Sequence, residues 1–193
     1  MRNIFIDLGA GSGDDIEGYF KLDPKNKLHE VFAWEANSDR IPNITKRFPF
    51  ATVVNAAAGI TNDTQKFFLG SIGPNSSSLL ENKVNVGKRG FRNIEVKDYC
   101  QWMKENFTAD DYITMVIDIE GSEYELLSKM YAEGLFDWIN QFYVEFHGKK
   151  LEGFDMKVED DLADLLINKF GNRVYIYERH QSSKFVRLNN EGT

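Results

Sequence analysis

The chain has 193 residues, of which 42% are hydrophobic, and this size fits one domain with one core. Its formal net charge of -7 does not attract a polyanion, so we do not expect a nucleic acid as partner. One cysteine cannot form an internal disulfide, which suits a reducing compartment. The sequence holds no apolar run of ~20 residues and no secretory signal, so we expect a cytoplasmic protein without a membrane partner.

Strands and helices alternate along the first half of the chain. Runs of β-branched and aromatic residues predict strands, and amphipathic spacing predicts helices. In order, we expect a strand over 3–8, a helix from Ile16 that ends at Pro24, a strand over 30–35, a helix over 38–48 with Pro42 in its first turn, a strand over 52–57 and a strand over 64–69.

The second half begins with a segment rich in Gly, Ser and Asn. We interpret residues 70–90 as a mobile loop inside a single domain, 1–193, because strands resume beyond it. The elements predicted after it are a strand over 93–96, a helix over 98–106, a buried strand over 112–119, a helix over 122–134, a strand over 141–146, a helix over 158–170, and a closing antiparallel pair over 174–177 and 185–188.

This alternation predicts an α/β fold with a Rossmann-like, doubly wound, mostly parallel sheet and a C-terminal antiparallel hairpin. In such sheets ligands bind beyond the carboxyl ends of the strands, near the point where the strand order reverses. The positions to inspect are therefore residues 7–13, Glu35, residues 55–57, residues 118–121 and residues 145–148.

The first predicted strand runs into a glycine-rich loop over residues 7–13. Glycines at alternate positions let the backbone turn sharply and approach a ligand, and the next helix offers N–H groups. Where a dinucleotide fingerprint has a small third residue, this chain has Asp14, whose carboxylate would repel a pyrophosphate. S-adenosylmethionine has no phosphate, and Asp7 and the loop amides suit its amino-acid end. Glu35 ends the second strand, where an acid accepts hydrogen bonds from ribose hydroxyls.

Acids and a histidine follow two further strands. Asp118 closes the most apolar run and Glu120 follows it, while Glu145 and His147 lie on one face at the end of the strand over 141–146. We expect these four residues to be catalytic, because a carboxylate or a histidine can take the proton of a hydroxyl. A divalent metal held by Asp118, Glu145 and His147 is an alternative that the sequence does not favour, because their spacing matches no recognised metal motif.

A basic group surrounds the predicted loop, and it comprises Lys83, Lys88, Arg89 and Arg92. Two interpretations stay open for it. The residues either belong to a solvated loop or contact an anionic substrate.

The motifs together resemble those of the FkbM family of S-adenosylmethionine-dependent methyltransferases. The resemblance rests on F-I-D-L-G-A-G-S-G at 5–13, F-A-W-E-A-N at 32–37, V-V-N-A-A-A-G at 53–59, S-S-S-L at 76–79, V-I-D-I-E-G-S-E at 116–123 and Y-V-E-F-H at 143–147. It implies a class I methyltransferase fold and a cofactor bound by Gly9, Gly11, Glu35, Asn55 and Ala56.

The full set of expected cofactor contacts is Asp7, Gly9, Ala10, Gly11, Gly13, Glu35, Ala36, Asn55, Ala56 and Asp118. The resemblance implies O-methylation of a hydroxyl on a sugar or another small metabolite, and a homodimer is compatible with the sequence. Two alternatives stay open: a nucleotide- or NAD-binding oxidoreductase, which shares the loop and Glu35, and a non-catalytic cofactor-binding module. The second arises because the family often has lysine where this chain has Val116.

Overall fold

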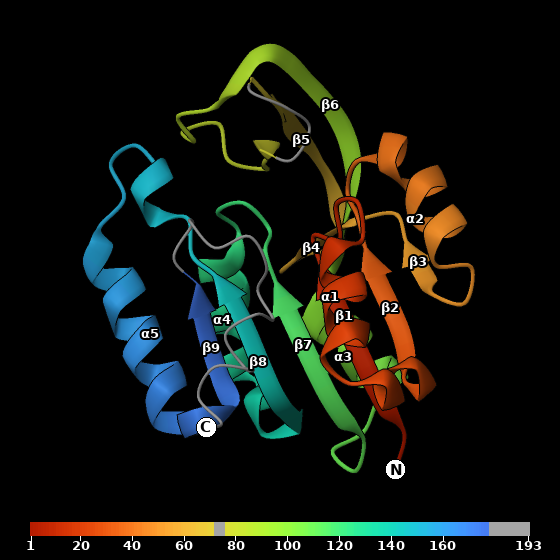
Figure 1. Cartoon of the computed structure of the whole chain (residues 1–193). Helices are drawn as coiled ribbons and strands as arrows, with labels where there is room; N and C mark the ends of the chain where they lie inside the picture. The colour runs from red at the N-terminus through yellow and green to blue at the C-terminus, as the bar shows by residue number, and fades with distance from the viewer. Residues whose placement is uncertain (72–75, 178–193) are drawn as a thin grey trace.

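The computed structural model describes residues 1–71 and 76–177. In this part of the chain, the main sheet has six strands in the order β3-β2-β1-β7-β8-β9, and every pairing is parallel (Figure 1). The strands are β1 (Asn3–Leu8), β2 (Glu30–Trp34), β3 (Thr52–Val54), β7 (Tyr112–Ile117), β8 (Ile139–Glu145) and β9 (Val174–Tyr177). The strand order reverses between β1 and β7, because the chain first builds outward from β1 through β2 to β3 and then returns.

Helices cover both faces of this sheet. Because side chains alternate along a strand, Ile4, Ile6 and Leu8 of β1 enter one core and Phe5 enters the other. The helices are α1 (Asp14–Leu22) and α2 (Ile41–Arg47) on the Phe5 face, and α3 (Tyr99–Asn106), α4 (Glu123–Ala132) and α5 (Met156–Phe170) on the opposite face. The architecture is therefore α/β, with a parallel sheet between two helical layers.

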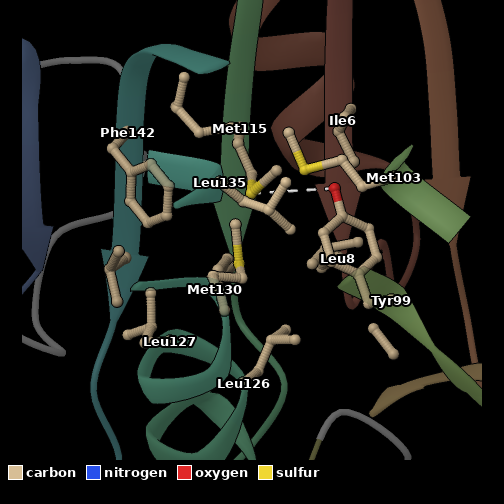
Figure 2. Close-up of a cluster of buried hydrophobic side chains, with 14 of the residues drawn as sticks. Ile6, Leu8, Tyr99, Met103, Met115, Leu126, Leu127, Met130, Leu135 and Phe142 are labelled. Atoms are coloured by element: carbon tan, nitrogen blue, oxygen red, sulfur yellow. Dashed lines mark hydrogen bonds between the residues drawn. The ribbon is translucent and has the colours of Figure 1, made fainter. Parts of the chain in front are cut away.

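The larger core lies between the sheet and helices α3, α4 and α5. Figure 2 shows Leu126, Leu127 and Met130 of α4 directed at the sheet, and all three are fully buried. Tyr99 of α3 keeps its hydroxyl in this apolar layer by donating to the Met115 sulfur at 4.0 Å (Figure 2). Each fully buried leucine contributes about 2 kcal/mol through the area removed from water, so this layer stabilises the packing of α4 against the sheet.

A second sheet forms an arm above that edge. It consists of β4 (Ala57–Gly59), β6 (Val86–Asp98) and β5 (Asp63–Gly70), in that order. β4 pairs with β6 in parallel, and β5 pairs with β6 in antiparallel fashion. The arm arches over the carboxyl ends of the central strands (Figure 1), so it brings residues distant in sequence to that end of the sheet.

Short 3-10 helices connect several of these elements. They are η1 (Pro24–Leu28), η2 (Ser38–Arg40), η4 (Leu135–Trp138), η5 (Gly148–Lys150) and η6 (Gly171–Arg173). Within the described ranges, no helix has the length and apolar character needed to cross a membrane.

Two sequence predictions are corrected here, and a third stays untested. The strand expected over 52–57 is two strands in different sheets, β3 and β4, because the chain leaves the main sheet at Asn55. The loop expected over 70–90 ends early, because residues from Val86 onward belong to β6, while residues 72–75 lie outside the described part. β9 pairs in parallel with β8, and the antiparallel partner expected over 185–188 lies outside the described residues.

Candidate functional site

The loops that follow β1 and β7 touch at the point where the strand order reverses. The Asp118 backbone N–H donates to the Leu8 carbonyl at 2.9 Å. Gly9 has a φ of +91°, and a Cβ atom there would lie 1.9 Å from the Asp118 carbonyl oxygen. Only glycine fits this position, since it tolerates the positive φ and presents no side chain to the neighbouring backbone. The close approach sets the distance between the glycine loop and the acids after β7.

Glu35 fixes the other side of the glycine loop. Its carboxylate accepts the Gly11 N–H at 2.7 Å and the Asn37 N–H at 2.6 Å. The side chain is buried, and this burial raises the pKa of Glu35 despite the two backbone hydrogen bonds. Asn55 donates its side-chain amide to the Glu35 carbonyl at 2.8 Å, which ties the end of β2 to the segment after β3.

A pocket opens between these loops and the arm, with about 570 Å³ of empty space that is partly open to solvent. Its apolar lining comprises Trp34, Ala36, Ala56, Ala57, Ala58, Phe67, Leu79 and Ile119. Its remaining lining comprises Gly9, Gly11, Glu35, Arg40, Ser77, Asp118, Glu120 and Ser122. The pocket is therefore lined by apolar side chains together with carboxylates, hydroxyls and one guanidinium group.

Most of the predicted cofactor residues lie in this lining: Gly9, Gly11, Glu35, Ala36, Ala56 and Asp118. Four lie outside the described lining. Asp7 is fully buried inside the sheet, and Ala10 lies in the core of the α1 face. At Gly13, a Cβ would lie 2.4 Å from the Phe48 ring, so this glycine serves helix packing. Asn55 is exposed and acts through the Glu35 backbone.

The predicted catalytic residues come together around His147. Its side chain is fully buried, and its Nε2 atom lies 3.5 Å from Asp118 Oδ1, 3.4 Å from Glu120 Oε2 and 3.4 Å from Glu145 Oε1. Burial by itself lowers the pKa of His147, but Glu123, Glu145 and Asp118 outweigh it and raise this pKa to about 10. At neutral pH and with no other cation present, the imidazole is therefore protonated and cannot act as a base.

Glu123 is a site residue that the sequence reasoning did not select. It is fully buried at the start of α4, and its Oε1 accepts the His147 backbone N–H at 2.8 Å and lies 3.1 Å from His147 Nδ1. Its Oε2 accepts the Gly121 N–H at 2.8 Å. Its position in the D-I-E-G-S-E motif, as the third acid after the buried strand, could have identified it.

Two lysines complete the charged cluster. Lys83 has a fully buried side chain, and its Nζ lies 2.7 Å from Glu120 Oε2. The same ammonium donates to the Ser76 carbonyl and to Asn85 Oδ1, both at 2.8 Å. Lys150, from η5, lies 3.5 Å from the same Glu120 oxygen. Lys83 does not follow a strand of the main sheet, and Lys150 lies just beyond the positions 145–148 expected after β8, so strand-end reasoning selected neither.

The predicted basic group thus divides in two. Lys83 enters the site, whereas Lys88 and Arg89 are exposed on the arm. Arg92 forms an ion pair with Asp39 at 2.8 Å, with both side chains largely exposed. The structure does not gather these residues into one basic patch.

The backbone at Glu120 is unusual. Among the described residues, Glu120 is the one non-glycine residue with a positive φ, at 56°. Such a conformation costs about 1–3 kcal/mol and is found where surrounding contacts enforce it. Here Ser78, from the segment between β5 and β6, donates its hydroxyl to the Glu120 carbonyl at 2.7 Å. The arm therefore stabilises the turn that directs Glu120 toward the pocket.

Comparison of the chain with protein-family models, curated protein sequences and solved structures finds no match in any of the three. The functional argument therefore depends on the geometry of this site.

Proposed function

We propose that the chain is an S-adenosylmethionine-dependent methyltransferase that methylates a hydroxyl oxygen of a sugar or another small metabolite. The observation that carries this proposal is the position of Glu35. Its buried carboxylate is held against the Gly11 amide in the lining of the pocket where the strand order reverses. The stretches that resemble FkbM motifs, among them residues 5–13, 32–37 and 116–123, contribute much of the same lining.

The lining suits the three parts of the cofactor. Apolar lining residues such as Ala57, Phe67 and Ile119 suit a flat purine. Each Glu35 oxygen accepts one backbone N–H and keeps a second lone pair for a ribose hydroxyl. Arg40, which lines the pocket beside Gly11, provides a positive charge for the carboxylate of the methionine portion.

A dinucleotide fits this loop less well. The first turn of α1 carries three acids, Asp14, Asp15 and Glu17. Hydrogen bonds from Ser12 and Arg47 lower the pKa of Asp14, so this carboxylate stays charged at neutral pH. Negative charge at a helix N-terminus stabilises the helix but repels a pyrophosphate. This favours the sulfonium cofactor over NAD.

In the proposed reaction, the acceptor oxygen attacks the methyl carbon while the carbon–sulfur bond breaks and its electron pair stays on sulfur. The products are the methyl ether and S-adenosylhomocysteine. The hydroxyl proton passes to the carboxylate of Asp118 or Glu120, because both line the pocket and His147 is already protonated. Positioning of the two reactants in line supplies a large part of the rate.

Calorimetric titration of the full chain with S-adenosylhomocysteine, and separately with NAD, tests this proposal. We expect binding of the first and none of the second. Tight NAD binding without S-adenosylhomocysteine binding would show that the proposal is wrong. Binding of S-adenosylhomocysteine without turnover of any hydroxylated acceptor would instead support a non-catalytic cofactor-binding module.

The role of Glu35 has a sharper test. We expect adenosine to bind at least ~10-fold more tightly than 2′,3′-dideoxyadenosine, because hydrogen bonds to a charged group contribute about 1.5–3 kcal/mol each. In the Glu35→Gln variant this difference should shrink. Asp39→Asn is the matched control, since Asp39 is an exposed acid four residues further along the chain. An equal preference for adenosine over 2′,3′-dideoxyadenosine in wild type and Glu35→Gln would show that Glu35 does not bind the ribose.

A further inference from the structure

Three side chains of metal-ligand type converge beside the pocket. Asp118, Glu120 and His147 each offer one ligand atom, and these atoms all lie within 4.8 Å of one another. We propose that these three residues bind a divalent cation of the Mn²⁺ type. The proposal concerns binding by the protein alone, and it does not require S-adenosylmethionine.

The distances within the cluster fit shared ligation better than direct hydrogen bonding. His147 Nε2 lies 3.5 Å from the Asp118 oxygen and 3.4 Å from the Glu120 oxygen. A charge-assisted N–H···O bond is about 2.7–2.9 Å long. Two neighbouring ligand atoms that each lie about 2.1 Å from one ion are separated by about 3.0 Å in octahedral geometry and by about 3.4 Å in tetrahedral geometry. The observed separations are longer than a direct hydrogen bond and long enough for these atoms to share one ion.

The orientation of His147 is the second observation. Nε2 is buried and makes no hydrogen bond within the described part of the chain, and it faces the carboxylates. The other ring nitrogen, Nδ1, lies 3.1 Å from Glu123 Oε1. Metal-ligating histidines commonly donate their second ring N–H to a carboxylate, which fixes the ring and raises its basicity. Glu123, itself held by the Gly121 amide, has this arrangement.

The local charge also favours a dication. Four carboxylates lie around the imidazole, and two ammonium groups pair with the Glu120 carboxylate; the six residues are Asp118, Glu120, Glu123, Glu145, Lys83 and Lys150. These six groups leave two negative charges, which one divalent ion balances when it displaces the imidazole proton. Lys83 pairs with the Glu120 carboxylate and holds it in place beside the ligand position.

The ligand types indicate which ion binds. Carboxylate oxygens suit Mg²⁺, Ca²⁺ and Mn²⁺, and an imidazole nitrogen shifts the preference toward transition metals, so Mn²⁺ satisfies both. Asp118 and Glu120 also line the pocket, which places the ion at its wall. If the proposed methyl transfer holds, the ion would bind the acceptor hydroxyl and favour loss of its proton.

Electron paramagnetic resonance of the chelator-treated full chain, titrated with MnCl₂, tests the site. We expect one Mn²⁺ bound per chain. Asp118→Asn and Glu120→Gln should each weaken binding at least ~10-fold. The control is Asp137→Asn, whose side chain is 69% exposed at the opposite end of β8, and it should bind as the wild type does. Wild-type affinity in both site variants, or no Mn²⁺ bound at millimolar concentration, would overturn the proposal.

Pulsed electron paramagnetic resonance of the wild-type Mn²⁺ complex adds a measurement that needs no variant. We expect a ¹⁴N coupling from the His147 imidazole, and its absence in a complex with bound Mn²⁺ would remove His147 from the ligand set. Thermal unfolding of each variant shows whether a loss of binding reflects a loss of fold. Because these measurements use no cofactor, Mn²⁺ binding and S-adenosylhomocysteine binding can each fail while the other stands.

Discussion

The backbone of Gly9 lies directly against the carbonyl oxygen of Asp118, with no room for even one additional carbon atom between them. This contact joins the loop after β1 to the loop after β7. Cofactor-side and acceptor-side residues of the proposed site therefore share one rigid support, the two central strands of the parallel sheet.

The first prediction concerns this contact. Gly9→Ala should destabilise the fold by more than about 3 kcal/mol, because the alanine must adopt a positive φ and also collides with backbone. Gly87→Ala is the matched control, since Gly87 has a φ of +87° and a Cβ added there would have no atom within 4 Å. This substitution should lower the free energy of unfolding only by the cost of a positive φ in alanine, about 1–2 kcal/mol. Urea unfolding measures both, and equal losses would refute the collision.

The sequence alone predicted those pocket-lining residues that follow strands of the main sheet. Gly9, Glu35 and Asp118 each follow a strand of the main sheet, and parallel strands bring their carboxyl ends to one edge. The bounds of β1 were also predicted correctly, because a short apolar strand followed by glycines has an unambiguous local pattern.

The remaining part of the site depends on long-range folding. The chain has 23 lysines and arginines, and no local feature distinguishes the buried Lys83 from the exposed Lys88. Lys83 reaches Glu120 only because the arm folds back over the sheet. β6 was predicted too short for a related reason: its residues 87–93 are exposed, so they lack the apolar alternation by which a strand is recognised.

The second prediction concerns pH and the ion pair between Asp111 and Arg2, whose closest atoms are 2.7 Å apart. Hydrogen bonds from Arg2 hold the pKa of Asp111 well below its usual value. A carboxyl group whose pKa is lower in the folded state stabilises the fold at pH values above its unfolded-state pKa of about 3.9. This stabilisation is lost as the pH falls below about 3.9 toward the folded-state pKa. Asp111→Asn should therefore lower the free energy of unfolding by about 1 kcal/mol at pH 7, and by less near pH 3.

Urea unfolding of wild type and Asp111→Asn at pH 7, 5, 4 and 3 measures this difference. The control is Asp110→Asn, which changes the exposed neighbouring residue and should match the wild type at each pH. A difference in free energy of unfolding between wild type and Asp111→Asn that stays constant over the four pH values would show that the carboxylate charge is not responsible.

The third prediction concerns Cys100, whose side chain is fully buried in α3. Burial raises the pKa of its thiol to about 12, and only the thiolate is an effective nucleophile. In the native protein at pH 8, Cys100 should not react with a disulfide reagent on the time scale of minutes, whereas in urea it should react at once. A Lys88→Cys, Cys100→Ala variant places a thiol on the exposed arm and should react rapidly without urea. Fast labelling of native Cys100 would contradict the packing of α3 on the sheet.

The fourth prediction concerns Lys83 and depends on the proposed methyl transfer. Lys83→Met retains most of the side-chain volume but removes the ammonium that holds the Glu120 carboxylate at 2.7 Å. We expect kcat to fall about 10-fold, because an acid or ligand at the pocket wall loses its fixed position. The Kd for S-adenosylhomocysteine should change less than about 2-fold, since Lys83 is not among the described residues that line the pocket. Lys88→Met, on the exposed part of the arm, should leave both quantities unchanged. A parallel loss of kcat and cofactor affinity in Lys83→Met would assign this lysine to folding of the arm, and the positioning of Glu120 would then need another source.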